Sequence, residues 1–312
     1  KEAGSLAGSI GRSRVLLSIE PDSVQVIGIE IKRNGILGLL TDLSGEVRLV
    51  SERAFRSGAS SHQVLECLHA VVDELHDEAE GRTGKLVGVG IGTPGPVDVR
   101  KGLVFEPPNF PGLRDLPLQR IIEERHGLQC VLNDDARTSA LGEAWFGAGR
   151  DAASLVFISL GEGIGSGVIL DYKLYEGAHD IAGQIGHFTV EPRGARCDCG
   201  NLGCLETVAS IPAIAARTKH ALRIDDHQLT DSEIVQELLK AYRAGIEQAA
   251  RLCEETIDYV VTAVLSAVNA YDPEVVILGG RLIQLCPDMV EVVKRRVRGR
   301  IYYHIADNLK IA

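Results

Sequence analysis

The sequence predicts an α/β protein made of two lobes, with a ligand-binding cleft between them. Twice along the chain an apolar strand pattern runs into a glycine-rich turn and is followed by helical patterns, the order that stacked α/β layers require. The length of 312 residues is sufficient for two hydrophobic cores. We find no self-similarity at a period of about 20–50 residues, which would indicate a solenoid.

The first lobe opens with apolar strand patterns that are separated by short turns, as in an antiparallel meander. These strands are expected over Arg14–Glu20, Gln25–Ile31, Ile36–Asp42 and Val47–Phe55. Ser60 and Ser61 offer a helix N-cap, and a helical apolar stripe follows through Val64, Leu65, Leu68, Val71, Val72 and Leu75. A buried strand over Lys85–Ile91 then leads into the turn Gly92–Pro96. A helix over Leu116–His126 and a strand over Gln129–Leu132 complete the lobe.

The second lobe repeats the pattern. A helix begins at Ala136, and a buried strand over Leu155–Leu160 precedes a glycine turn and another strand through Leu170. Three or four helices are expected between Ser210 and Ala270. Pro273–Leu278 is expected to be the last buried strand, and it ends at Gly279-Gly280.

The composition limits the function classes. Apolar residues make up 45% and charged residues 24%, as in ordinary globular proteins, and the net charge of −10 argues against a nucleic-acid-binding surface on this chain. We find no apolar run that is long enough to span a bilayer and no signal peptide, so no membrane partner is expected. Four cysteines are isolated in apolar or helical contexts, which is typical of reduced thiols in the cytoplasm: Cys67, Cys130, Cys253 and Cys286.

The other three cysteines, Cys197, Cys199 and Cys204, fall within eight residues. His187 lies ten positions before the first of them, and Gly200 and Gly203 allow tight turns between them. Three thiolates and one imidazole form the closed tetrahedral shell that structural zinc prefers. A disulfide, or buried thiols that cluster by chance, are the alternatives. The pattern favours a structural Zn²⁺ ion.

Polar residues follow the strand that ends near 132, where Asp134 and Asp135 precede a helix. Carboxylates at the carboxyl edge of a sheet lie where ligands bind in open α/β folds, and one of them is suited to accept a proton from a substrate hydroxyl or to hydrogen-bond it. An N-cap pair for the following helix explains the same residues equally well.

Two glycine-rich stretches are weaker signals. The turn Gly161–Gly167 fits either a phosphate cradle or a simple hairpin, and Glu162 at its centre would repel a polyphosphate. Gly279-Gly280 permits close approach of an adenine ring or of another backbone segment.

Gln184 and His187 precede the cysteine cluster and Glu206 follows it, so closure of the cluster would gather them on one wall. His187 is suited to bind zinc through one nitrogen and a ligand hydroxyl through the other. Such polar groups, without a basic residue, suit a neutral polyol such as a sugar. For Glu206, capping of the next helix is the alternative.

Together these motifs resemble the signature of the ROK family, which contains repressors, open reading frames and sugar kinases. The resemblance rests on Gly183-Gln184-Ile185-Gly186-His187 and on the cysteine cassette that ends at Glu206. It extends in the family's order through the segments Gly92–Pro96, Asn133–Ala136, Leu160–Gly163 and Asp272–Gly280. It implies an actin-like (ribonuclease-H-like) ATPase fold, a structural zinc and a sugar site in the cleft.

The resemblance also implies roles for single residues. Asp135 occupies the position of the catalytic base of the kinases, and Asp134 occupies the position of their sugar-binding Asn. Gln184 occupies a position where the family usually has Glu. His187 and Glu206 match the remaining sugar ligands, and Gly95 matches the turn that lines the pocket. The implied zinc ligands are His187, Cys197, Cys199 and Cys204.

Two departures favour the repressors over the kinases. Kinases of the family carry an Asp-x-Gly-Gly-Thr phosphate loop after the first strand, where this chain has Glu30-Ile31-Lys32-Arg33-Asn34. Loss of those glycines should cripple phosphoryl transfer, which depends on positioning and charge stabilisation. In addition, the stretch from Gly11 to Pro21 resembles the linker that joins a winged helix to this domain in ROK repressors.

We therefore predict the sugar-binding and oligomerising part of a ROK-type transcriptional repressor and no enzyme activity. Residues 1–22 would be the linker after a missing DNA-binding domain, residues 23–133 the first lobe, and residues 134–312 the second, with the last helices packing back on the first lobe. The expected partners are a small neutral sugar, operator DNA through the missing winged helix, and one or three further copies of the chain. A divergent sugar kinase with Asp135 as general base is the alternative, and a structural or redox zinc protein without a ligand is a third reading.

Overall fold

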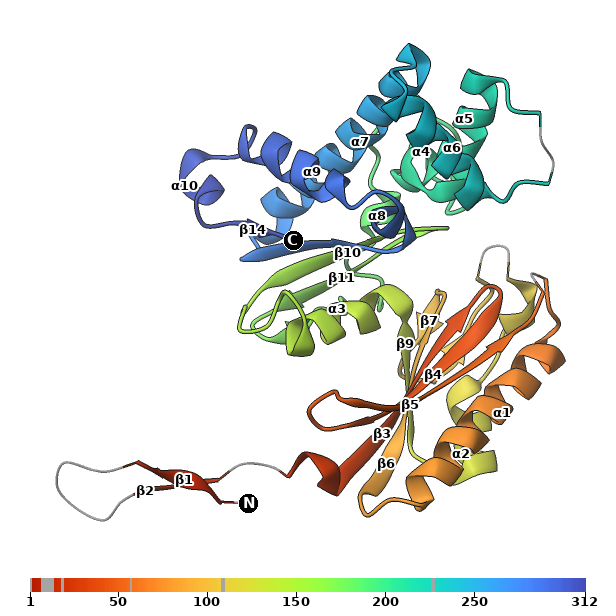
Figure 1. Cartoon of the computed structure of the whole chain (residues 1–312), viewed down its shortest axis with the longest axis vertical. Helices are drawn as coiled ribbons and strands as arrows, with labels where there is room; N and C mark the ends of the chain where they lie inside the picture. The colour runs from red at the N-terminus through yellow and green to blue at the C-terminus, as the bar shows by residue number, and fades with distance from the viewer. Residues whose placement is uncertain (1, 7–13, 18–19, 57, 108–109, 226–227) are drawn as a thin grey trace. The chain divides into compact units, whose positions relative to one another are not determined.

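The computed structural model describes residues 2–6, 14–17, 20–56, 58–107, 110–225 and 228–312. The chain divides into two compact units, Lys1–Asp135 and Ala136–Ala312, which are described one after the other (Figure 1). In the described residues no helix is long and apolar enough to cross a membrane.

Unit 1 begins with a small hairpin in which β1 (Glu2–Leu6) pairs antiparallel with β2 (Arg14–Leu17). The strand predicted over Arg14–Glu20 therefore ends at Leu17, residues 18–19 lie outside the described residues, and the chain continues into a 3-10 turn, η1 (Pro21–Ser23). β1 was not predicted, because its Ser and Gly residues have little β propensity by themselves.

The main sheet of unit 1 has the strand order β5-β4-β3-β6-β9. The predicted meander is confirmed: β3, β4 and β5 pair antiparallel, while β6 and β9 add to β3 in parallel. The strands are β3 (Val24–Lys32), β4 (Gly35–Asp42), β5 (Val47–Ala54), β6 (Lys85–Thr93) and β9 (Cys130–Asp134).

Two helices lie beside the sheet of unit 1 (Figure 1). Their apolar side chains are buried in the core of that unit. Helix α1 (Ser61–Glu80) starts with a capping box between Ser60 and Gln63, and the predicted stripe is buried except for the partly buried Leu65. A Cβ atom at Gly38 would clash with Val71 and Leu75, so the close approach of α1 to β4 requires glycine there. Helix α2 (Leu118–His126) ends at Gly127 in the left-handed conformation. Three short elements lie between β6 and α2, namely β7 (Val97–Asp98), β8 (Leu103–Val104) and η2 (Pro111–Leu113).

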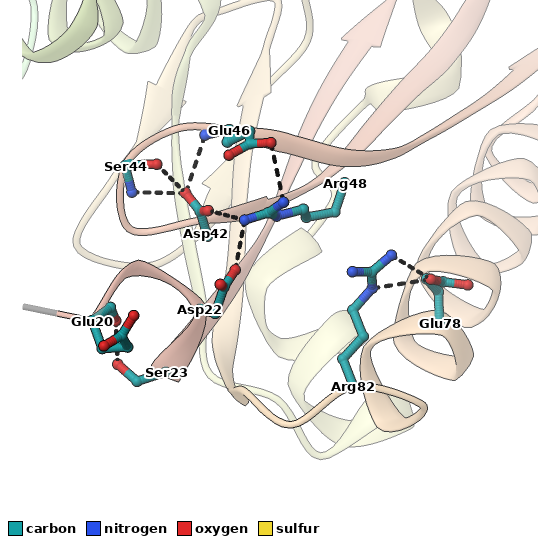
Figure 2. A network of polar contacts seen from close by, with 9 residues as sticks. All are labelled: Glu20, Asp22, Ser23, Asp42, Ser44, Glu46, Arg48, Glu78 and Arg82. Atoms are coloured by element: carbon teal, nitrogen blue, oxygen red, sulfur yellow. Dashed lines mark hydrogen bonds and ion pairs between the residues drawn. The ribbon is translucent and has the colours of Figure 1, made fainter.

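An arginine ties η1 to the turn between β4 and β5 (Figure 2). The Arg48 guanidinium donates to Asp22 at 2.5 Å, to Asp42 at 2.7 Å and to Glu46 at 3.1 Å. Hydrogen bonds from Ser44, Glu46 and Arg48, with the Ser44 hydroxyl first among them, hold the pKa of Asp42 at about 2. The network thus fixes the segment that enters the sheet of unit 1.

A histidine pair links α1 to α2 and makes unit 1 sensitive to acid. His69 Nδ1 lies 2.9 Å from His126 Nε2, and His126 Nδ1 lies 3.2 Å from Asp73 Oδ1. Asp73 accepts a hydrogen bond from His126 Nδ1–H. His126 Nε2 can then accept a hydrogen bond from His69 Nδ1–H only while His126 is neutral, because both nitrogens of a protonated imidazole carry protons. Burial, together with the nearby Arg125 and His126 charges, lowers the pKa of His69 to about 4, and burial also lowers the pKa of His126.

This geometry predicts an acid-dependent loss of stability. A histidine whose pKa is lowered on folding binds fewer protons in the folded state than in the unfolded state. Its contribution to the free energy of unfolding is therefore fully present above the pKa of the unfolded state and is lost as the pH falls toward 4. We expect the free energy of unfolding to fall by about 1–2 kcal/mol between pH 6.5 and 4.5 on this account, after allowance for solvent screening. Urea unfolding of a His69→Asn/His126→Asn variant should lack that part of the slope. His62→Asn, at an exposed position of the same helix, should keep it; equal slopes in all three proteins would contradict the prediction.

The sheet of unit 2 has the strand order β12-β11-β10-β13-β14. β10 and β11 form an antiparallel hairpin, and β13 lies parallel to β10 on its other side. Pro273–Leu278 was expected to be the last strand, but the strand there is Val275–Gly279 and β14 pairs with it in parallel. The strands are β10 (Leu155–Leu160), β11 (Ile164–Leu170), β12 (Lys173–Leu174), β13 (Val275–Gly279) and β14 (Lys310–Ile311).

This sheet is buried on both faces. Helix α3 (Asp135–Phe146) covers one face in a small core around Ala140, Leu155 and Phe157. The other helices bury the opposite face around Val156 and Ile158, which alternate with the first set along β10 as strand geometry requires. They are α4 (Glu206–Ala209), α5 (Ile211–Leu222), α6 (Asp231–Arg243), α7 (Glu247–Tyr271), α8 (Arg281–Leu285), α9 (Asp288–Arg298) and α10 (Tyr303–Ala306).

The last helices contribute to the core of unit 2. Helix α9 inserts Met289, Val293 and Val297 into the core of unit 2, against α7. These side chains are four residues apart, so they form a single apolar stripe on one face of the helix. An amphipathic helix buries such a stripe against the core next to it.

Candidate functional site

The segment from Gln184 to Glu206 folds as a knuckle. Its two ends are joined by isolated bridges between Thr189 and Cys204 and between Arg196 and Leu202. Gly203 has a φ of +61°, and a Cβ atom there would collide with the Glu191 carbonyl. That carbonyl approaches so closely because both Val190 N–H and Glu191 N–H donate to Gly203 O, at 2.9 and 3.1 Å. Only glycine fits at this crossing.

The knuckle brings together the four residues that were predicted to bind a metal. The ligand atoms of His187, Cys197, Cys199 and Cys204 all lie within 4.8 Å of one another. Cys197 Sγ is 3.6 Å from His187 Nδ1, and Cys199 Sγ is 3.7 Å from Cys204 Sγ. A tetrahedron with metal–nitrogen and metal–sulfur bonds of about 2.0–2.3 Å has edges of about 3.6–3.8 Å. The cluster is therefore suited to hold one metal ion.

The sulfur positions do not fit the disulfide alternative. Cys199 Sγ and Cys204 Sγ are 3.7 Å apart, far longer than the bond of about 2.05 Å that a disulfide requires, and Cys197 is also a free thiol. Burial raises the pKa of Cys197 and brings that of Cys204 to about 12, so both thiols keep their protons at neutral pH until a cation displaces them. Asn201 Nδ2 also lies 3.4 Å from Cys204 Sγ, where it would stabilise a metal-bound thiolate.

Glu206 is the first residue of α4, and its carboxylate faces the β10–β11 turn. Ile164 N–H donates to Glu206 Oε2 at 2.8 Å, and a Cβ atom at Gly163 would lie 2.9 Å from the same oxygen. The turn itself closes through a bond of 3.0 Å from Gly161 N–H to Gly163 O. The stretch Gly161–Gly167 is therefore a hairpin whose turn ends at Gly163, since Ile164–Gly167 belong to β11.

A loop leads into the knuckle at Gln184, whose side chain is exposed. Its carbonyl accepts from His187 N–H at 3.0 Å and so starts the 3-10 turn η3 (Ile185–His187). His187 is half-buried and its Nδ1 faces the sulfurs, which leaves Nε2 on the opposite edge of the ring. In this arrangement one nitrogen is directed to the metal and the other is available to a ligand.

Sequence reasoning missed two residues that hold this loop. Ser166 Oγ donates to Gly183 O and accepts from Ile185 N–H at 3.1 Å. Arg137, a fully buried side chain on α3, donates from Nη2 to Asp180 O at 2.7 Å and to Ala182 O at 3.4 Å. No local pattern marks these residues, because their partners lie 17 to 45 positions away.

The remaining predicted ligand residues lie in unit 1, at the carboxyl ends of β6 and β9. Asp134 ends β9 and pairs with Thr93 of β6, and Asp135 is the exposed first residue of α3. A Cβ atom at Gly95 would lie 3.6 Å from Asp134 Cβ, so the Gly92–Pro96 turn contacts this strand end. The predicted helix start at Ala136 is one residue late. Gly95, Asp134 and Asp135 thus share one sheet edge, while Gln184, His187 and Glu206 belong to unit 2.

The stretch Glu30–Asn34, which stands at the family's phosphate loop, is a tight hairpin. Glu30, Ile31 and Lys32 pair along β4 with Leu37, Ile36 and Gly35, and only two residues form the turn. Lys32 Nζ lies 3.7 Å from Glu30 Oε2. The backbone of Glu30–Lys32 forms hydrogen bonds with β4, and the side chains of this stretch are long. The stretch therefore has no group of free backbone N–H donors that could surround a phosphate.

Comparison with known proteins agrees with this architecture. A model described as the ROK family matches residues 26–311. The chain is 31% identical over 306 residues to a putative xylose repressor of Caldicellulosiruptor sp., covering 95% of this chain and 76% of that protein. It is 37% identical over 220 residues to a glucokinase of Thermotoga maritima, covering 68% of this chain and 69% of the glucokinase.

Solved structures show the same fold. A ROK family transcriptional regulator, a homologue of the E. coli MLC protein, superposes with a TM-score of 0.80 at 25% identity, covering 96% of this chain and 76% of the regulator. A ROK hexokinase from Thermus thermophilus superposes with a TM-score of 0.75 at 30% identity, covering 92% of each chain. The two units thus have the actin-like ATPase fold, and the chain belongs to the ROK family.

Proposed function

We propose that the chain is the effector-binding part of a ROK-type transcriptional repressor and has no kinase activity. The observation that carries this proposal is the hairpin Glu30–Asn34, whose turn has long side chains where the resemblance places the glycines of the kinases' phosphate loop. Without backbone N–H groups around the terminal phosphate, phosphoryl transfer loses the positioning on which it depends. The xylose repressors among the relatives match 95–99% of this chain and support the same choice.

The effector we propose is a small neutral sugar. The residues proposed to bind it are Gly95, Asp134, Asp135, Gln184, His187 and Glu206. Carboxylates, an amide and an imidazole accept and donate hydrogen bonds to hydroxyl groups, and none of these side chains is a cation that would select a phosphate. The names of the relatives make xylose the first sugar to test. N-Acetylglucosamine is the second, because the chain is 28% identical over 289 residues to a protein of E. coli O6:H1 named as an N-acetylglucosamine repressor.

The metal we propose is a structural Zn²⁺ bound by His187, Cys197, Cys199 and Cys204. With all four positions filled by protein ligands, the ion would have no site for a reactive water and would act by holding His187 in place. The sugar and the zinc would then meet at opposite edges of one imidazole ring.

Regulation would follow from the sugar's different affinity for two arrangements of the protein. We propose that the chain forms a homodimer or homotetramer in the cytoplasm, and that sugar binding changes the spacing of DNA-binding modules that read the operator. A divergent sugar kinase is the second candidate, and the observation that favours it is Asp135, an exposed carboxylate at the sheet edge where a general base would act.

A paired assay tests the two candidates. We expect xylose or N-acetylglucosamine to raise the melting temperature of the protein in the absence of ATP. The Gln184→Ala variant should bind that sugar with an affinity about tenfold lower, because it lacks one hydrogen bond to the sugar. Gln129→Ala, also exposed but outside the proposed site, should bind as the wild type does. Sugar-dependent ADP release at about 1 s⁻¹ or faster would refute the repressor proposal in favour of the kinase.

A further inference from the structure

A groove of about 750 Å³ lies between α5 and α7 in unit 2, and none of the residues of the proposed sugar and metal sites lines it. Its apolar lining consists of Ala216, Ala221 and Leu252. Its polar lining is mostly basic: Arg217, His220, Arg223, Gln248, Arg251 and Glu255.

The charge of this α5–α7 groove is opposite to that of the chain. The whole sequence carries a net charge of −10, yet the lining has three arginines and a single carboxylate, Glu255. That carboxylate is already neutralised, because Arg217 Nη2 donates to Glu255 Oε2 at 2.5 Å. Within the described ranges, neither Arg223 nor Arg251 has a carboxylate within ion-pair distance. Two guanidinium groups therefore remain to attract an anion.

The side of the groove formed by Arg217 is preorganised. Arg217 also donates from Nη1 to Val208 O at 3.1 Å, and its guanidinium lies over the Tyr259 ring at 5.9 Å from the centroid. The Tyr259 hydroxyl in turn donates to Glu191 Oε2 of the knuckle at 3.1 Å. A cation held by three contacts loses little freedom on binding a ligand.

Arg223 reaches the groove from the end of α5. It is the C-cap residue of the helix and takes a left-handed backbone conformation with a φ of 54°, stabilised by its N–H bond to Lys219 O. His220 precedes it in the last turn of α5 and is exposed, as are Arg223 and Arg251. The donors thus come from two helices that face one concavity.

We infer that the α5–α7 groove binds the phosphoryl group of a small phosphate ester, at a site separate from that of the sugar. Guanidinium groups form paired, charge-assisted hydrogen bonds with phosphate oxygens, and Gln248 and His220 add donors for the remaining oxygens and the ester group. A DNA backbone fits the groove less well, since duplex DNA needs an extended basic surface rather than a concavity that also contains Glu255.

The test follows the arginine Nε–Hε signals by NMR while glycerol 2-phosphate is added to the wild-type chain, with glycerol and sodium chloride titrated separately. We expect saturable shifts of the Arg223 and Arg251 signals with the ester only, and an affinity about tenfold lower in each of Arg223→Ala and Arg251→Ala. Arg298→Ala, an exposed arginine of α9 outside the groove, is the matched control and should bind as the wild type does. Unchanged melting temperatures would show that the variants remain folded.

Three outcomes would overturn the inference. The first is the absence of saturable shifts up to about 10 mM ester, a concentration well above that needed to fill a site of millimolar affinity. The second is an equal loss of binding in Arg298→Ala, which would indicate a general charge effect. The third is binding of a random-sequence DNA duplex, but not of the ester, that depends on Arg223 and Arg251. None of these results depends on whether a sugar binds elsewhere.

Discussion

Replacing Cys199 with serine is expected to lower bound zinc to well below one ion per chain. Cys199 is exposed, so a serine fits there without strain, but its hydroxyl is a far poorer zinc ligand than a thiolate. Without the ion, the loop from Phe188 to Cys204 loses its main cross-link, because zinc binding to such sites is itself folding free energy. We expect the melting temperature to fall by about 5–10 °C, the equivalent of about 2–3 kcal/mol in a chain of this size.

The measurement is zinc content after gel filtration, together with differential scanning calorimetry. Sugar affinity should also fall in Cys199→Ser, because His187 would lose the ion that orients its ring. Cys67→Ser, at a half-buried thiol of α1, is the matched control and should keep both zinc and sugar affinity. A full complement of zinc in Cys199→Ser would show that the metal shell has been assigned wrongly.

Replacing Arg137 with methionine should lower the free energy of unfolding by about 2–4 kcal/mol, since carbonyl groups that are buried without donors cost about 1–3 kcal/mol each. Methionine fills much of the same volume but cannot donate to Asp180 O and Ala182 O. The effect should be greatest in the loop that leads to Gln184, which Arg137 and Ser166 hold in place.

Hydrogen exchange detected by mass spectrometry would locate this change. In Arg137→Met the amides from Gly177 to His187 should exchange faster, whereas those of β10 should keep their protection. Arg120→Met removes an exposed arginine of α2 that pairs with Glu124, and it should change stability by less than about 0.5 kcal/mol. Unaltered exchange of the loop in Arg137→Met would mean that Ser166 and the knuckle position it alone.

The sequence was most informative where the determining interactions are local. The stripe from Val64 to Leu75 identified α1, because residues three and four positions apart share a helix face. The metal-ligand cluster of the knuckle could also be predicted from the sequence. Its four ligand residues fall within 18 positions of one another, and three thiols with one imidazole are a common ligand set of structural zinc. The fold class followed from the order of these elements and from the resemblance to a family.

Features that depend on distant partners were not predicted. The apolar pattern that ends at Leu309-Lys310-Ile311-Ala312 is too short to predict a strand, and β14 forms there by pairing with the edge of β13. Likewise Arg137 looks like an ordinary surface residue of a helix until its partners at Asp180 and Ala182 are known. The carboxylate of Glu206 was expected to serve either a ligand or a helix cap, and its bond to Ile164 N–H depends on a hairpin 42 residues away.

The short strand β14 also matters for how this protein is handled. Lys310 N–H donates to Glu274 O, Ala312 N–H donates to Val276 O, and Leu278 N–H donates to Ala312 O, at 2.8–3.0 Å. The final residues therefore cover one edge of a strand whose side chains are almost entirely buried. Deleting residues 309–312 would uncover a row of unpaired amide and carbonyl groups beside Val275–Gly279, an apolar template on which other chains can add. Self-association into insoluble material, rather than simple loss of ligand response, is the expected consequence of such a truncation.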